Sequence, residues 1–138
     1  MPSGLTMEPL EILLVEDNAG DALLATQALA EAPLPVKVHI ARDGAQALQM
    51  LASFQPNIVI LDLRLPEIDG LKMLEYYHPT NVPIVVFSGS NRESDKLLAK
   101  ASGASEYIVK PFDLRAFRSA LWGIVERWGR KQGSGAGP

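Results

Sequence analysis

Strand-like and helix-like segments alternate along the body of this 138-residue chain, and this alternation restricts its possible folds more than any other feature. Short apolar or alternating runs predict five strands, at residues 12–15, 36–40, 57–61, 83–87 and 106–109. Polar capping residues predict the starts of helices, at Asn18, Asp43, Ser90 and Asp113, and a shorter helix is predicted over residues 70–77. Each predicted strand is therefore followed by a helix.

Most of these strands are continuously apolar, which indicates a parallel sheet covered by helices on both faces. The right-handedness of crossover connections leaves few possible topologies. We predict the α/β class, with a flavodoxin-like, doubly wound sheet of five parallel strands in the order 2-1-3-4-5. Ligands of such sheets bind at the carboxyl ends of the strands, so functional residues are expected there.

Composition narrows the class of protein further. Hydrophobic residues make up 47% and charged residues 21%, as in an ordinary globular domain, and there are no cysteines to form disulfides or zinc–thiolate sites. We expect one domain over residues 10–130, a disordered N-terminus over 1–9 and a flexible Gly/Ser tail over 131–138. The absence of a signal-like or membrane-length apolar run predicts a cytoplasmic protein that does not bind membranes.

Charge is distributed unevenly along the chain. Residues 1–112 carry 8 basic and 14 acidic side chains, whereas residues 113–138 carry 5 basic and 2 acidic ones. An acidic body argues against nucleic-acid binding, which requires a basic surface. The basic residues near the C-terminus are expected mainly to complement the dipole of the last helix.

Polar residues follow the predicted strands at one edge of the sheet. Glu16 and Asp17 follow the first strand, Asp62 the third, Ser88 the fourth and Lys110 the fifth. Carboxylates that lie close together repel one another unless a cation neutralises them, and oxygen ligands of this kind suit Mg²⁺. An aspartate beside Mg²⁺ and a lysine can act as a nucleophile toward phosphorus, so the cluster predicts an aspartyl phosphate.

Four sequence blocks resemble the signatures of response-regulator receiver domains of the CheY-like type. They are Val15-Glu16-Asp17-Asn18, the segment 62–70 that begins Asp62-Leu63-Arg64, Ser88-Gly89-Ser90, and Tyr107-Ile108-Val109-Lys110-Pro111. The resemblance covers residues 10–130. It implies a single-domain response regulator that accepts a phosphoryl group on Asp62 from a sensor histidine kinase or a histidine phosphotransfer protein, and that then changes a protein-binding surface.

The resemblance also implies a role for each site residue. Asp17 and Asp62 would bind Mg²⁺ through their carboxylates, and Glu16 would act mainly through a water. The backbone carbonyl of Arg64 would supply a further ligand. Lys110 would hold the phosphoryl oxygens, and its peptide bond to Pro111 is expected to be cis. Ser88 would bind a phosphoryl oxygen and so leave space for the ring of Tyr107 to turn inward. Beyond self-phosphorylation and slow self-dephosphorylation, no enzymatic activity is expected.

Weaker sequence cues concern partners. Asp21 after the first block, and Arg42-Asp43-Gly44 at the second helix, resemble stand-alone regulators of bacterial phytochrome-type kinases. Trp122 lies beyond the edge of the apolar stripe of the last helix, where it either covers the sheet edge or anchors a homodimer formed by the fourth helix, the fifth strand and the last helix. Family kinases usually dock on the first helix and the loop after the fifth strand.

Three alternatives stay open at the level of sequence. The chain is a piece of a longer regulator whose output domain follows Pro138, or it is a phosphohydrolase that uses the same aspartate and Mg²⁺, or it is a flavin or nucleotide carrier. The second is disfavoured because haloacid-dehalogenase-type hydrolases place another aspartate where this chain has Arg64. The third is disfavoured because no glycine-rich loop follows the first strand.

Overall fold

The computed structural model describes residues 8–65, 69–77 and 81–129, so most of the two predicted tails lies outside the described residues. Five parallel strands form one sheet in the order β2-β1-β3-β4-β5. Their bounds are β1 Leu10–Val15, β2 Val36–Ala41, β3 Ile58–Leu61, β4 Ile84–Ser88 and β5 Glu106–Val109. The predicted flavodoxin-like topology is confirmed.

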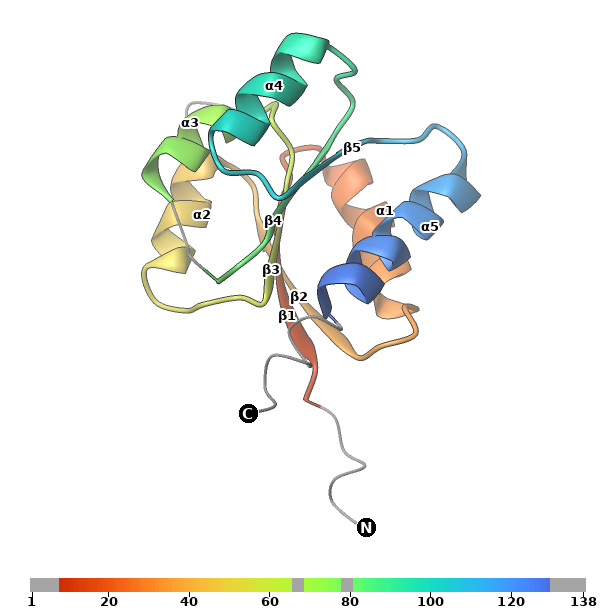
Figure 1. Ribbon diagram of the computed structural model, residues 1–138. Coiled ribbons are helices and arrows are strands. Elements are labelled where there is room, and N and C mark those ends of the chain that lie inside the picture. Colours follow the sequence, from red (N-terminus) through yellow and green to blue (C-terminus); the bar gives the residue numbers. More distant parts are fainter. Residues whose placement is uncertain (1–7, 66–68, 78–80, 130–138) are drawn as a thin grey trace.

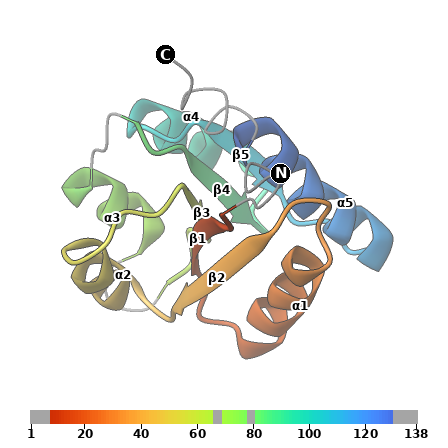
Figure 2. The same cartoon turned by 90° about the horizontal axis from the view of Figure 1, so that it is seen from below.

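The helices cover both faces of this sheet. They are α1 Ala19–Ala30, α2 Gly44–Leu51, α3 Gly70–Tyr76, α4 Glu93–Ala101 and α5 Leu114–Ile124, with a π-helical turn η2 at Val125–Gly129 continuing α5. Figures 1 and 2 show α1 and α5 on one face and α2, α3 and α4 on the other. None of the helices within the described ranges is long and apolar enough to cross a membrane.

Alternate residues of each central strand supply two separate hydrophobic cores. In β1, Ile12 and Leu14 face the core formed with α1 and α5, whereas Leu13 and Val15 face the core formed with α2 and α3. Neighbouring strands repeat this pattern, because successive side chains of a strand point to opposite faces. Burial on both faces explains why β1, β3 and β4 are apolar at nearly every position.

Most predicted helix starts are confirmed, but one is wrong. Asn18, Asp43 and Asp113 each accept a backbone N–H from the first turn of the helix they cap. α4, however, begins at Glu93 after Arg92, whose side chain makes no capping hydrogen bond. The hydroxyl of Ser90, which was predicted to cap this helix, donates to Asp95 and accepts the Arg92 N–H at 3.3 Å. These bonds hold the chain in a loop for two further residues.

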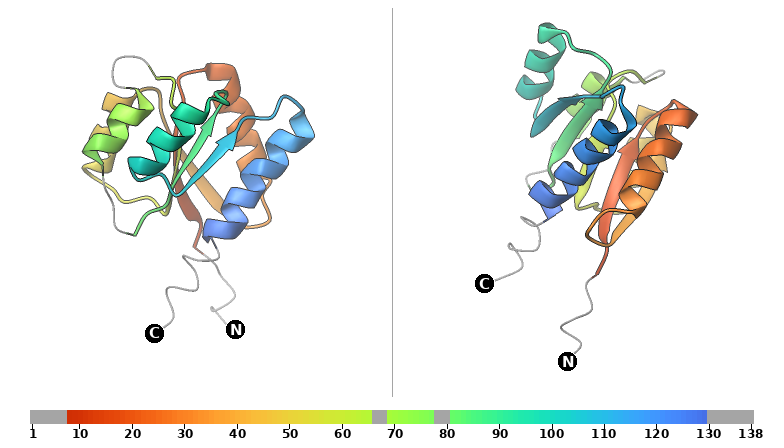
Figure 3. Two further views of the ribbon diagram at one scale, coloured as in Figure 1. Left: turned by 45° about the horizontal axis from the view of Figure 1, so that its top comes forward. Right: turned by 90° about the vertical axis from the view of Figure 1, so that its right-hand side faces the viewer.

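Because all five strands run in the same direction, their carboxyl ends meet at one edge of the sheet. The loops β1–α1, β4–α4 and β5–α5 leave the sheet at this edge, as the views in Figure 3 show, and residues 62–65 continue from β3 there. The sheet therefore brings together segments that are far apart in the sequence. This edge holds the polar residues that the sequence singled out.

Candidate functional site

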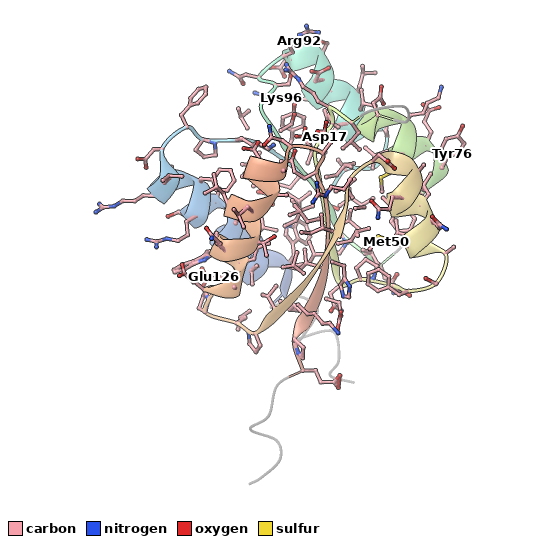
Figure 4. All side chains as sticks on the ribbon, turned by 180° about the vertical axis from the view of Figure 1, so that it is seen from behind. Asp17, Met50, Tyr76, Arg92, Lys96 and Glu126 are labelled. Carbon is pink, nitrogen blue, oxygen red and sulfur yellow. The ribbon has the colours of Figure 1, made fainter. Side chains whose placement is uncertain are left out.

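Three carboxylates gather at the carboxyl ends of β1 and β3. Oxygens of Glu16, Asp17 and Asp62 all lie within 4.8 Å of one another. Backbone hydrogen bonds continue the sheet one residue past each strand, from Glu16 N to Ala41 O and from Asp62 N to Val15 O. Glu16 and Asp62 are buried and Asp17 is exposed; Figure 4 shows Asp17 at the end of the molecule where Arg92 also lies. The sheet thus places the carboxylates that the sequence predicted side by side.

The ammonium of Lys110 lies in the middle of these acidic groups. Its Nζ donates to Glu16 Oε1 at 2.6 Å, to Asp21 Oδ2 at 2.8 Å and to Asp62 Oδ2 at 2.9 Å. The Lys110 side chain is 11% exposed. A lysine ammonium has three N–H donors and no acceptor, so every donor of Lys110 is used.

The burial of these charges changes two pKa values. Burial, assisted by the nearby charge of Asp62 and opposed by the hydrogen bond from Lys110, raises the pKa of Glu16 from 4.5 to about 7. Burial by itself would lower the pKa of Lys110. The hydrogen bonds to Asp21, Asp62 and Glu16 outweigh that effect and hold the Lys110 pKa above its ordinary value. Lys110 therefore remains charged throughout the physiological range.

The remaining oxygens of the two buried carboxylates are held by backbone donors. Asp62 Oδ1 accepts the backbone N–H of Arg64 at 3.1 Å, and Glu16 Oε2 accepts that of Asn18 at 3.2 Å. The side chain of Arg64 is exposed. Both oxygens of Asp62 are thus oriented, one by the lysine and the other by the loop that follows β3.

Ser88 and Tyr107 contact the same loop from different strands. Ser88 is fully buried at the end of β4, and its hydroxyl accepts the N–H of Ser90 at 3.3 Å. Tyr107, half-buried on β5, donates its hydroxyl to the carbonyl of Ser90 at 2.9 Å. The two predicted switch residues therefore meet at Ser90, in the loop between β4 and α4.

The acidic cluster has the donor chemistry that a hard divalent cation requires. Its ligand atoms are carboxylate oxygens, the ligands that Mg²⁺ prefers. Glu16 also carries a pKa raised to about 7, mainly because its carboxylate is buried, and the nearby charge of Asp62 contributes to this rise. Glu16, Asp17 and Asp62 thus fit a magnesium ion.

Asp21 is the site residue that the sequence reasoning missed. From the sequence, Asp21 serves only as a weak cue to a phytochrome-type kinase, yet its carboxylate accepts a hydrogen bond from Lys110 directly. One signal was available, because Asp21 lies in the first turn of α1, shortly after Glu16 and Asp17 at this edge of the sheet.

Two other expectations differ from the structure or are narrowed by it. The Lys110–Pro111 bond is trans rather than cis, since no described residue has a cis peptide bond; trans is the more stable form before proline.

Trp122 is half-buried: its indole N–H donates to Ala28 O at 2.7 Å, and Arg118 lies 5.2 Å from its ring centre. Trp122 therefore joins α5 to α1, and the homodimer stays a prediction.

Comparison with known proteins decides the family. Residues 12–121 match the family model of the response regulator receiver domain. The chain belongs to this family. The match shows that this receiver domain is a phosphoacceptor module of two-component signalling, and it does not support the phosphohydrolase alternative.

Individual relatives support the same family assignment. This chain is 30% identical over 131 residues to the probable methanogenesis regulatory protein FilR2 of Methanothrix harundinacea, and the match covers 88% of this chain and 84% of FilR2. It spans smaller shares of AtoC from Escherichia coli and TrcR from Mycobacterium tuberculosis, 22% and 46% of their lengths.

Two solved structures with about the same sequence identity to this chain as FilR2 also have the same fold. The phosphorylated cyanobacterial phytochrome response regulator RcpA is 33% identical with a TM-score of 0.81, over 88% of this chain and 94% of RcpA. The Mn²⁺-bound response regulator Rcp1 is 30% identical with a TM-score of 0.78, over 87% of this chain and 94% of Rcp1.

Proposed function

We propose that this receiver domain accepts a phosphoryl group on Asp62 from the phosphohistidine of a cytoplasmic sensor kinase or phosphotransfer protein. One observation carries the assignment: the Asp62 carboxylate is buried within an acidic cluster and paired with the Lys110 ammonium at 2.9 Å. In the transfer, an Asp62 oxygen forms a bond to phosphorus while the bond from phosphorus to the histidine nitrogen breaks. Electrons pass to the imidazole, and no oxidant or further reactant is needed.

The neighbours of Asp62 have distinct proposed roles in this transfer. Lys110 would place its positive charge against the phosphoryl oxygens, whose negative charge arrives at Asp62 with the transferred group. The backbone N–H of Arg64 keeps Asp62 oriented. Glu16, Asp17, Asp62 and the Arg64 carbonyl would hold Mg²⁺, which when bound neutralises carboxylate and phosphoryl charge. The manganese-bound relative Rcp1 supports a divalent cation here.

The signal would leave the site through Ser90. A phosphoryl group adds about 1.5 to 2 negative charges and three acceptor oxygens beside the end of β4. Ser88, whose hydroxyl now accepts the Ser90 N–H, has a hydroxyl proton to donate to such an oxygen. Tyr107 holds the carbonyl of the same Ser90, so a shift of this residue would be transmitted to β5 and to the start of α4.

A docking surface for the kinase lies beside Lys110. A hollow of about 480 Å³, bordered by α1 and the loops after β4 and β5, includes Lys110 together with Leu24, Phe112 and Leu114. Phe112 is fully exposed, and Leu24 and Leu114 are also exposed. An apolar rim around the catalytic lysine suits the helices that carry a phosphohistidine. Phytochrome regulators among the relatives, RcpA and the bacteriophytochrome response regulator AtBRR, favour a phytochrome-type kinase.

Phosphorylation from a small donor tests the assignment directly. Purified protein incubated with acetyl phosphate and Mg²⁺ should gain one phosphoryl group, which intact-mass spectrometry detects. Asp62→Asn should gain none, because an amide is not a nucleophile toward phosphorus. Asp43→Asn, the same change at the partly buried N-cap of α2, should gain the group as the wild type does. Uptake by Asp62→Asn equal to wild type would place the acceptor elsewhere.

A further inference from the structure

Asp21 occupies a position that the functions described so far leave unexplained. Its carboxylate lies 2.8 Å from Lys110 Nζ, yet it does not belong to the group of three carboxylates whose oxygens cluster within 4.8 Å. Its backbone is held in place, because Asn18 caps α1 by accepting the Asp21 N–H at 2.8 Å. The Asp21 side chain is 37% exposed, more than the buried carboxylates of Glu16 and Asp62 that share Lys110 with it.

The number of lysine donors makes this contact consequential. Lys110 has three N–H donors, and Glu16, Asp21 and Asp62 use all of them. A phosphoryl group on Asp62 brings several new acceptor oxygens to the same ammonium. Each donor that Asp21 retains is unavailable to those oxygens.

The charge of Asp21 acts on two ligands in opposite directions. With Asp21, the site holds four carboxylates and one lysine, which pairs with Glu16, Asp21 and Asp62, so the site is more negative by one charge than the three-carboxylate cluster alone would make it. An added negative charge attracts a divalent cation. The same charge repels a phosphoryl group and partly neutralises the lysine that would hold it.

We propose that Asp21 is a positioning residue for Lys110, which retains one ammonium donor in competition with the phosphoryl oxygens. It thereby weakens the hold of the site on a phosphoryl group and strengthens the binding of Mg²⁺. The inference rests on the proposed phosphoacceptor role of Asp62 and adds a means by which this chain limits the retention of its phosphoryl group.

Asp21→Asn tests this inference, because it removes the charge while keeping the shape and a neutral acceptor. Two affinities are measured: that for Mg²⁺ by titration calorimetry, and that for trifluoroberyllate, an analogue of the phosphoryl group, by ¹⁹F NMR at saturating Mg²⁺. We expect Mg²⁺ to bind about threefold to tenfold more weakly and trifluoroberyllate about threefold to tenfold more tightly, as one partly exposed charge would cause.

The opposite signs separate competition from a structural role. A variant whose site is merely loosened would bind both ligands more weakly. Glu31→Gln, which removes one charge from the exposed end of the same helix, is the matched control and should leave both affinities unchanged. The inference would be overturned if both affinities of Asp21→Asn were unchanged, or if Glu31→Gln shifted them equally. It would also be overturned if Asp21→Asn showed any combination other than weaker Mg²⁺ binding with tighter trifluoroberyllate binding.

The same measurements distinguish a failure of the proposed function. The phosphoacceptor assignment, and the inference with it, would be refuted if the wild-type protein bound no trifluoroberyllate in the presence of Mg²⁺. The same conclusion would follow if Asp62→Asn bound trifluoroberyllate as tightly as the wild type. Wild-type protein that bound trifluoroberyllate through Asp62, with Asp21→Asn behaving identically, would refute the role of Asp21 alone.

Discussion

The Lys110 ammonium donates to Asp62 across 2.9 Å, although the two residues are 48 positions apart in the chain. The lysine side chain is 11% exposed and the aspartate side chain 9% exposed, so the contact is largely shielded from water. Shielding strengthens the attraction between the charges and makes either one costly to bury alone. The pair therefore links the stability of the domain to its chemistry.

Lys110→Met should destabilise the protein in the absence of Mg²⁺. The substitution keeps an unbranched apolar side chain but leaves Glu16 and Asp62 buried without their counter-ion. We expect a loss of about 3 kcal/mol in the free energy of unfolding, the lower end for breaking a buried ion pair. Urea denaturation with EDTA at pH 8 measures it. Lys37→Met on the exposed side of β2 is the control, with an expected change within about 0.5 kcal/mol; equal losses in the two variants would contradict the prediction.

Glu16 should make the metal-free protein less stable as pH rises. Its pKa is about 7 in the folded protein against an ordinary 4.5, so between these values the folded state binds the proton that the unfolded state has released. The free energy of unfolding therefore falls by roughly 2–3 kcal/mol as pH rises from about 4.5 to about 7. The slope is at most about 1.36 kcal/mol per pH unit and is smaller near each of the two pKa values. The contribution of Lys110 is constant in this window, because its raised pKa lies above it.

Glu16→Gln isolates that effect. A glutamine cannot ionise, so the unfolding free energy of the variant in EDTA should change less with pH over this window than that of the wild type. Denaturant titrations at several pH values provide the comparison. Parallel profiles for the two proteins would show that Glu16 is not the titrating group.

Tyr107→Phe should loosen the loop between β4 and α4 without preventing phosphorylation. It removes the 2.9 Å hydrogen bond to the Ser90 carbonyl, a loss of about 1 kcal/mol. Hydrogen exchange at the start of α4 should become faster, while uptake from acetyl phosphate persists because Tyr107 does not contact Asp62. Tyr76→Phe, at an exposed position on α3, serves as the control. Unaltered exchange in Tyr107→Phe would remove Tyr107 from the proposed signalling route.

Phe112→Ala should separate kinase docking from phosphoryl chemistry. The Phe112 side chain is fully exposed, so its removal should change the unfolding free energy by no more than about 0.5 kcal/mol. Transfer from a phosphorylated histidine kinase that is active on the wild type should slow by about tenfold or more, as expected for an aromatic anchor. Uptake from acetyl phosphate should stay unchanged. Tyr76→Ala removes another exposed aromatic away from the hollow; an equal slowing there would argue against docking at Phe112.

Local chemistry explains why much of this protein could be predicted from its sequence. Apolar runs such as residues 58–61 form strands because a sheet with both faces covered buries every position. Asn18, Asp43 and Asp113 cap helices because their side chains bond to N–H groups only three residues ahead. Once the strands are parallel, the residues that follow them meet at one edge, which is why the clustering of Glu16, Asp17 and Asp62 could be foreseen.

The tertiary structure alone decided the contacts that depend on how the elements pack. The bond of Asp21 to Lys110 requires the first turn of α1 to approach the residue that follows β5, and sequence spacing does not specify that approach. The same holds for Trp122, which reaches a carbonyl at the end of α1, and for Ser90, which serves the loop rather than capping α4. Short-range patterns encode where strands and helices begin and which residues follow them. Which partner each polar side chain meets across the fold depends on how the helices and strands pack together, and only the folded chain defines that packing.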